Sequence, residues 1–303
     1  MSETPPGQPL ADAFSEATAG EPGLHEDELL EAWMAALPAI GEAGDLAAET
    51  HRGQRAFVDF RPHDELPADE RRSQLADLLV VTYTSTDPPD LRVCLLQARR
   101  RPGPLPAVAG DVPLARARFN VYHWDLLHRR PAIAPAGNVT PPRRILADAR
   151  LPSLGGSLVF HRPDPEAWQL SFASAEVTRP WGEWPPAKRP RRTVRFPDVT
   201  AWRRRSGYRE TLAAAGVADL GELLAEGVVG SPVQLPPARE SDRLTASWLA
   251  AVLAATVRKR EAGEAELAAD LHERLTDALA GAGLVDADSR VGAPHVAIVR
   301  ARR

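Results

Sequence analysis

The chain has 303 residues, enough for one large domain or two small ones, because hydrophobic cores stop growing at roughly 250–300 residues. Hydrophobic residues make up 44% and charged residues 26%, which excludes a collagen-like or disordered chain. No segment is apolar over the ~18 residues that a bilayer span needs, and the first residues lack a signal-peptide pattern. The single cysteine, Cys94, excludes an intrachain disulfide. We therefore expect a cytoplasmic protein with no membrane partner.

The net charge of −4 is unevenly distributed along the chain. Residues 1–50 are acidic, whereas residues 179–209 are strongly basic and contain interleaved tryptophans. Arginines neutralise phosphates and aromatic rings stack on bases, so this region predicts a nucleic-acid surface. The alternative is a loop whose arginine stems and indole rings cover the core. The candidate nucleic-acid-binding residues are Lys188, Arg189, Arg191, Arg192, Arg203, Arg204, Arg205 and Trp202.

The first part of the chain contains one clear helix. Residues 1–23 are rich in Pro, Gly and Glu without periodicity, which is typical of a disordered tail. Apolar residues then recur at helical spacing over 26–37, behind acidic residues suited to a helix N-terminus. A less regular helical stretch is expected at 40–49, and a short strand at 56–60.

Two hairpins are predicted in the middle of the chain. Residues 77–97 contain two apolar, β-branched segments around a proline turn at 87–90, so we expect two buried central strands. A second hairpin is expected over 157–172. Between them, residues 101–156 are rich in proline and helical only near 121–127. These elements predict an α/β fold, with a mixed central sheet flanked by helices.

Beyond residue 210 the sequence becomes mainly helical. Leucines at helical spacing indicate three helices, the longest of which would be capped by Ser241 or Asp242, and residues 294–299 indicate a closing strand. We therefore expect a helical C-terminal extension. The predicted organisation is a disordered tail (1–23), an α/β core (24–175), a basic aromatic loop region (176–210) and a helical part with a closing strand (211–303).

The first hairpin places polar residues together. If its strands pair symmetrically about Pro88, residues whose numbers add to about 175 lie opposite one another. Asp77 then lies beside the step from Gln97 to Arg99. A carboxylate at the start of one strand would face Gln-x-Arg at the end of its neighbour, where side chains leave the sheet. This end of the hairpin is therefore a candidate site.

Asp-Leu-Leu-Val at 77–80, followed by Leu-Leu-Gln-Ala-Arg at 95–99, resembles the PD-(D/E)XK restriction-endonuclease-like superfamily, above all Mrr-type members whose second strand ends in Gln-x-Lys. It also resembles a group of uncharacterised bacterial proteins with Leu-Leu-Gln-Ala-Lys at this place. The resemblance implies a Mg²⁺- or Mn²⁺-dependent nuclease whose metal ligands are Asp77, Gln97 and an acid on the first helix. Glu49 or Glu42 is the candidate for that acid. Asp77, Gln97 and Arg99 would be the catalytic residues.

This sequence departs from the family pattern at two places. Arg99 stands where lysine is expected, and arginine stabilises phosphate charge but does not relay a proton readily. The bacterial group has an acid shortly before its Gly-Asp step, where this chain has Gln74 and Ala76. The leading hypothesis is a nucleic-acid-binding protein that cuts its substrate with a divalent metal. The alternative is a catalytically degenerate, non-enzymatic interaction protein of the same fold that binds a protein partner.

Other motifs give weaker indications of function. His123, Asp125 and His128 have a spacing that could serve zinc, but an amphipathic core helix explains it much better. Cys94 lies in an apolar strand, and we expect it to be a small, buried hydrophobic residue. The sequence has no G-x-S-x-G, Walker A, G-x-G-x-x-G or H-E-x-x-H motif, so no organic cofactor is indicated.

Overall fold

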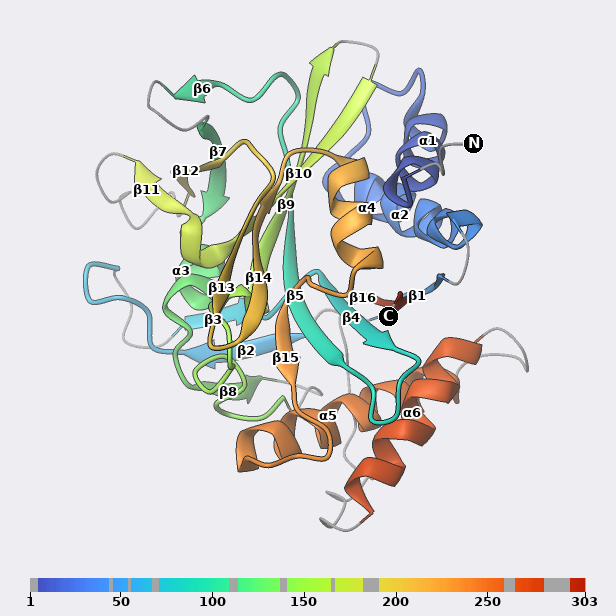
Figure 1. Cartoon of the computed structure of the whole chain (residues 1–303). Helices are drawn as coiled ribbons and strands as arrows, with labels where there is room; N and C mark the ends of the chain where they lie inside the picture. The colour runs from blue at the N-terminus through green and yellow to red at the C-terminus, as the bar shows by residue number, and fades with distance from the viewer. Residues whose placement is uncertain are drawn as a thin grey trace.

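A large mixed sheet forms the centre of the protein, with helices on both faces and two small sheets beside it (Figure 1). The structure is a computed structural model. It describes residues 5–43, 46–53, 56–66, 71–108, 114–136, 141–164, 167–181, 191–258, 265–280 and 295–302. The chain is therefore a mixed α/β protein, as the sequence predicts.

The large sheet has nine strands. Eight of them form one path, in the order β1 (Ala47–His51), β16 (His295–Ala301), β4 (Leu78–Thr84), β5 (Leu91–Arg100), β9 (Gly155–Asp164), β10 (Ala167–Ser174), β14 (Tyr208–Ala214) and β13 (Ala201–Arg205). The ninth, β15 (Ser231–Val233), pairs with the first part of β5. Both β16–β4 and β5–β9 are parallel pairs, whereas β4 and β5 form an antiparallel hairpin.

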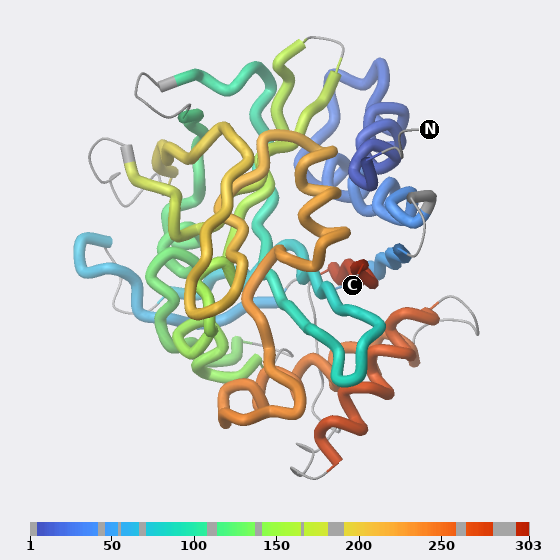
Figure 2. Tube along the Cα trace, viewed as in Figure 1, coloured from blue at the N-terminus to red at the C-terminus, as the bar shows by residue number. Residues whose placement is uncertain are grey.

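Helices cover the two faces of this sheet. One face packs against α1 (Gly7–Thr18), α2 (Glu26–Ala36) and α4 (Val217–Ala225). The opposite face packs against α3 (Val121–Arg129), α5 (Glu240–Val257) and α6 (Glu266–Leu279). Figure 2 follows the same trace and shows α5 and α6 together at the lower edge of the view. Because apolar side chains cover both faces, all seven residues of β4 are buried.

Two small sheets and three short 3₁₀ helices complete the described chain. The four-stranded sheet has the order β11 (Arg179–Trp181), β12 (Arg191–Pro197), β7 (Leu114–Asn120) and β6 (Ala107–Val108). The three-stranded sheet has the order β3 (Arg71–Gln74), β2 (Phe57–Phe60) and β8 (Ile133–Ala136). The 3₁₀ helices are η1 (Leu37–Ala43), η2 (Pro152–Leu154) and η3 (Ala175–Val177).

Both predicted hairpins are present, with one correction to the register. Leu78 pairs with Leu96 and Tyr83 with Leu91, one residue away from the expected pairing. The ladder ends at the pair Leu78–Leu96, and the Asp77 amide donates to the carbonyl of Leu96 instead of that of Gln97. Asp77 therefore lies just beyond the regular pairing, beside Ala98.

The expectations for the two ends of the chain were wrong in part. The predicted tail at 1–23 contains helix α1, because Leu10 and Phe14 are buried against α2, α4 and the sheet. The helical stretch expected at 40–49 is instead η1 followed by β1. The C-terminal helices are present, but β14, β15 and β16 belong to the central sheet. Much of the described part of the region expected to be a loop (176–210) lies in β11, β12 and β13.

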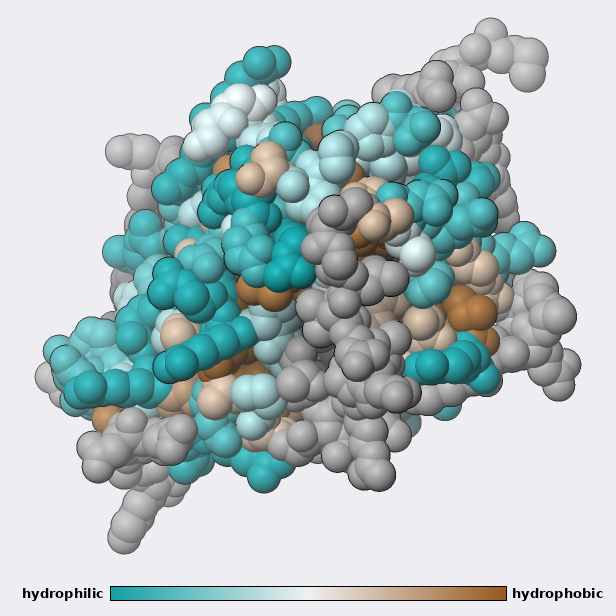
Figure 3. Space-filling view, turned by 90° about the horizontal axis from the view of Figure 1, so that it is seen from below, coloured by the Kyte–Doolittle hydropathy of each residue, from teal (hydrophilic) through white to brown (hydrophobic). Residues whose placement is uncertain are grey.

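The surface seen from below is largely hydrophilic in its described part, with small hydrophobic areas between polar ones (Figure 3). Among the helices of the described ranges, none is both long and apolar enough to cross a bilayer. The largest described side chain that is both hydrophobic and exposed is Trp202, with 51% of its surface accessible. The described exterior therefore resembles that of ordinary globular proteins.

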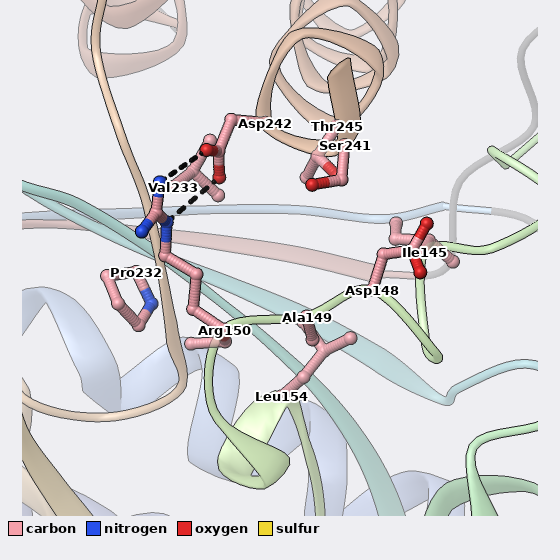
Figure 4. A pocket seen from close by; sticks show the side chains of 11 residues that line it. Ile145, Asp148, Ala149, Arg150, Leu154, Pro232, Val233, Ser241, Asp242 and Thr245 are labelled. Carbon is pink, nitrogen blue, oxygen red and sulfur yellow. Dashed lines mark hydrogen bonds and ion pairs between the residues drawn. The ribbon is translucent and has the colours of Figure 1, made fainter. Parts of the chain in front are cut away.

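An ion pair attaches α5 to the loop that precedes η2. Arg150 donates to both carboxylate oxygens of Asp242, at 3.2 and 2.6 Å (Figure 4). Asp242 is only 4% exposed and lies inside α5, so it does not cap the helix as the sequence suggested. The cavity beside this pair has a volume of about 20 Å³, enough for a single water. We conclude that the pair is structural.

We predict that Asp242→Asn lowers the free energy of unfolding by about 2–4 kcal/mol, because it leaves the Arg150 guanidinium without its buried counter-charge. Urea denaturation would measure this loss. Asp148→Asn is the matched control, since its partner Arg144 is exposed and such pairs contribute less than about 1 kcal/mol. An equal loss in both variants would contradict a special role for the buried pair.

Candidate functional site

The end of the first hairpin gathers the polar residues that the sequence singled out. The Asp77 amide donates to the carbonyl of Leu96 at 2.8 Å, just beyond the last regular pair of β4 and β5. The amide of Ala98 in turn donates to Asp77 Oδ2 at 2.8 Å. These two bonds fix the Asp77 carboxylate beside the last residues of β5, next to Gln97 and Arg99.

A second carboxylate reaches the same point from α2. Glu26 is the first residue of α2, and its Oε2 accepts a hydrogen bond from the Arg100 amide at 3.0 Å. Arg99 Nη1 lies 3.4 Å from Glu26 Oε1 and 3.6 Å from Asp77 Oδ2. Since Arg99 is only 8% exposed, its guanidinium forms a buried bridge between the two carboxylates.

The other side of the guanidinium faces α3. Arg99 Nη2 donates to Gln97 Oε1 at 3.0 Å and lies 2.7 Å from His123 Nδ1. A guanidinium only donates, so His123 Nδ1 is the acceptor and the ring hydrogen resides on Nε2. Asn120 caps α3 by accepting from the Tyr122 amide at 3.0 Å, which fixes the helix that carries His123. Arg99 thus connects β4, β5, α2 and α3. We call Glu26, Asp77, Gln97, Arg99 and His123 the Arg99 centre.

Burial and charge set the protonation of this centre. Burial, assisted by the positive charge of Arg99, lowers the pKa of His123 to about 3. Burial also raises the pKa of Glu26, and Arg99 opposes this rise while Asp77 adds to it. At neutral pH His123 is therefore uncharged.

A cleft of about 410 Å³ opens beside the Arg99 centre. It is lined by Glu26, Arg99, Arg100, Arg101, Pro102, Arg118, Asn120, His123 and Arg191. Five of these residues are arginines and one is acidic. Such a lining favours anions, and arginine is suited to bidentate contact with phosphate.

The basic lining continues over one face of the four-stranded sheet. Arg116 on β7 pairs with Arg195 on β12, which pairs with Arg179 on β11, so these three share a face. Arg118 and Arg191 lie on the same face and reach the cleft. The opposite face carries Phe119, Val194 and other apolar residues of a separate core. No acidic residue occurs in the four strands. We call this surface the basic face.

Glu49, the acid predicted to complete the site, lies elsewhere. Its Oε2 accepts from the Leu267 amide at 2.8 Å, and its Oε1 contacts His51. Strand β16 separates β1, which carries Glu49, from β4, so Glu49 is not among the groups gathered at Asp77. The side chain of Glu42 lies outside what the structure describes. The acid that the structure brings to Arg99 and Asp77 is Glu26 instead.

The predicted nucleic-acid-binding residues divide into several groups. Arg191 lies at the cleft, whereas Arg192 is 8% exposed and belongs to the buried side of β12. Arg203 and Arg205 form ion pairs with Glu176, and Arg203 also pairs with Glu210 at 2.7 Å. The remaining candidates are Trp202 and Arg204, which are exposed on β13, and Lys188 and Arg189, which lie outside the described residues.

The Arg99 centre does not suit a divalent cation in this arrangement. Arg99 already donates to Gln97 Oε1, and its Nη1 lies between the carboxylates of Glu26 and Asp77. Nowhere in the described ranges do three or more Asp, Glu, His or Cys residues gather as metal ligands would. The zinc alternative is not supported either, because Asp125 binds Arg129 and His128 binds the carbonyl of Ala175.

Comparisons of the chain with protein-family models, with curated proteins and with solved structures found no match. The interpretation of the site therefore depends on its own geometry. The one signal that could have identified Glu26 is its position at the start of the helix predicted over 26–37. The acids at this place indicated only the N-terminus of that helix.

We predict that removing the guanidinium creates a metal-binding site. In Arg99→Ala the oxygens of Glu26, Asp77 and Gln97 face one another without a cation, and oxygen ligands suit Mn²⁺ or Mg²⁺. The variant should unfold at a lower temperature in EDTA, and Mn²⁺ at ~100 times its Kd should restore about 2.7 kcal/mol. Differential scanning calorimetry would measure both effects. An equal gain in stability with Mn²⁺ in wild type, or in the double variant Arg99→Ala, Asp77→Asn, would contradict the predicted metal site.

The protonation of His123 predicts a loss of stability in mild acid. The pKa of His123 is about 3 in the folded protein, and an unfolded histidine titrates near 6.5, so only the unfolded state binds this proton between those values. This contribution to stability is complete above pH ~6.5 and decreases as the pH falls, by at most about 2 kcal/mol at pH 5. Urea denaturation at several pH values should show a smaller loss in His123→Gln.

Glu26 provides a control of opposite sign. Its pKa is raised in the folded protein, so the folded state binds more protons and this contribution to stability increases as the pH falls. Glu26→Gln should therefore steepen the loss in acid, whereas His123→Gln should flatten it. An unchanged pH profile in His123→Gln would show that other groups cause the acid sensitivity.

Proposed function

We propose that this chain is a nucleic-acid-binding protein with a restriction-endonuclease-like core, in which Arg99 takes the place of the metal ion. The observation that carries the proposal is the continuous set of arginines from the cleft to the basic face. Regularly spaced cationic side chains on a sheet neutralise a phosphate backbone without requiring a particular base sequence.

The residues of the Arg99 centre support the restriction-endonuclease-like core. The resemblance implies an acid on the first helix, an aspartate at the start of one strand and Gln-x-Lys at the end of the next. Asp77 and Gln97 stand at the two strand positions, and Glu26, at the start of α2 and so on the second helix of the structure, converges with them on one point. Arg99 occupies the place of the lysine. The convergence of residues from two separate parts of the chain is more specific than the short sequence match alone.

The charge of the cleft favours binding of a phosphate group. The positive charge of Arg99 is offset by Glu26 and Asp77, so Arg99 contributes little net charge. Arg118 and Arg191 are exposed on the basic face and belong to strands without acidic residues. The Nε2 hydrogen of His123 provides a further, neutral donor at the cleft wall. The net excess of donors and positive charge suits a polyanion.

The same geometry supports binding better than hydrolysis. A water nucleophile needs a proton acceptor with a pKa near the working pH. Arginine remains protonated, and the pKa of His123, about 3, lies far below neutrality. We therefore propose that the protein binds nucleic acid without cutting it. Metal-dependent cleavage, the second candidate, is favoured by the meeting of Glu26 and Asp77, but it requires Arg99 to leave its position.

We predict that the double variant Arg118→Ala, Arg191→Ala binds DNA more weakly than wild type. Losing two phosphate contacts should reduce the slope of log affinity against log salt by roughly 1.4–1.8. Fluorescence anisotropy with labelled single-stranded and duplex 20-mers at several salt concentrations would measure this. Arg144→Ala is the matched control, because Arg144 is an exposed arginine outside the cleft. Equal salt slopes in wild type and both variants would contradict the proposal.

A cleavage assay separates the two candidate functions. Wild type incubated with Mn²⁺ should leave both DNA substrates intact under conditions in which it binds them. Asp77→Ala serves as the background for contaminating nucleases. Cleavage by wild type that disappears in Asp77→Ala would replace the binding-only proposal with the metal-dependent nuclease.

A further inference from the structure

A second cleft lies at the other end of the same hairpin. Its volume is about 540 Å³, within the range of sites for small ligands. It lies beside Thr84 and Leu91, the end of β4 and the start of β5, whereas Asp77 precedes the first residue of β4. Seven strand residues at ~3.3 Å each separate the two places by roughly 20 Å. We call it the hairpin-end cleft.

The wall of the hairpin-end cleft contains a buried guanidinium. Arg92 is 9% exposed and lines the cleft. Its Nη1 donates to the carbonyls of Arg209, Val228 and Gly230 at 2.8, 3.2 and 3.3 Å. These three bonds fix the orientation of the side chain but provide no formal negative charge.

No carboxylate of the described chain lies within ion-pair distance of Arg92. Of the nearby glutamates, Glu226 is paired with Arg209, and Glu210 is paired with Arg203. Asp90 lines the cleft and acts on Arg92 over a longer distance, and burial outweighs this effect and lowers the pKa of Arg92. A buried charge without a counter-charge is costly, and a bound anion would offset that cost.

A glycine provides one of the carbonyls that bind Arg92. Gly230 has a φ of 92°, which other residues rarely adopt. A Cβ at this position would lie 2.4 Å from the carbonyl oxygen of Val93, so no other residue fits without a shift. Gly230 therefore brings the loop against β5 and presents its carbonyl to Arg92.

The remaining walls are mixed. They contain the ring of Tyr208 and the side chains of Pro88, Leu91 and Val233, and also the charged residues Asp90, Glu226 and Arg302. A ligand at this cleft would place an anionic group at Arg92 and an apolar or planar body beside Tyr208 and the apolar side chains.

We propose that the hairpin-end cleft binds a small organic anion, with a carboxylate or phosphate group on Arg92 and an apolar ring beside Tyr208. This site is separate from the nucleic-acid surface proposed above and does not depend on it. Benzoate and phenyl phosphate represent the two anionic groups, and benzamide is the neutral control of the same shape. Isothermal titration calorimetry with the full chain would measure their binding, which we expect in the millimolar range.

Two variants make the test specific. Arg92→Gln removes the charge but keeps a donor for the carbonyls, and it should weaken binding of the anions roughly tenfold or more. Gln234→Trp changes an exposed residue of the cleft wall and should block the cleft while Arg92 remains intact. It also removes the hydrogen bond that Gln234 Oε1 accepts from Arg150, so its folding has to be checked. The thermal midpoint and far-ultraviolet circular dichroism of each variant, measured without probe, would show that it is folded.

The outcomes are distinct. Saturable binding of benzoate or phenyl phosphate, without binding of benzamide and lost in both variants, supports the site, and the preferred probe identifies the anionic group. Equal binding of benzamide, unchanged binding in folded Gln234→Trp, or no binding of either anion would overturn it. None of these results depends on whether the protein binds DNA.

Discussion

The arrangement of the Arg99 centre depends on one guanidinium between two carboxylates. Glu26 and Asp77 meet at the end of the central hairpin, and without a cation their charges would repel, as the effect of Asp77 in raising the pKa of Glu26 indicates. Arg99 offsets this repulsion while it donates to Gln97 and His123. The start of α2, the register of β4 with β5 and the cap of α3 therefore form a single cooperative unit.

This arrangement determines which chemistry the cleft favours. A divalent metal would neutralise the same carboxylates and leave coordination positions for water and phosphate, whereas Arg99 fills the space with a permanently protonated group. The remaining positive charge lies outside the centre, on Arg118, Arg191 and the rest of the basic face. Charge placed there can attract and orient a phosphate backbone, but it provides no acceptor for the proton of an attacking water.

The sequence predicted local elements better than the contacts between them. The hairpin of β4 and β5, and helices α2 and α3, follow from apolar spacing and turn residues that lie close together in the chain. Helix α1 was missed because it has only two large apolar residues, Leu10 and Phe14, which are buried against elements that include some far along the sequence. Asp77, Gln97 and Arg99 were placed together because one hairpin carries them. Glu26 was not, because its position depends on how α2 packs on β5.

Strand β5 carries a buried arginine near each end, and the two are compensated differently. Arg99 lies near two carboxylates, so its charge is balanced within the protein. Arg92 has three backbone carbonyls, whose dipoles orient it but leave its formal charge unbalanced. Dipoles alone stabilise a buried charge less than an ion pair with good geometry does. The same strand therefore has one centre that is complete without a ligand and one cleft in which an anion would complete the electrostatics.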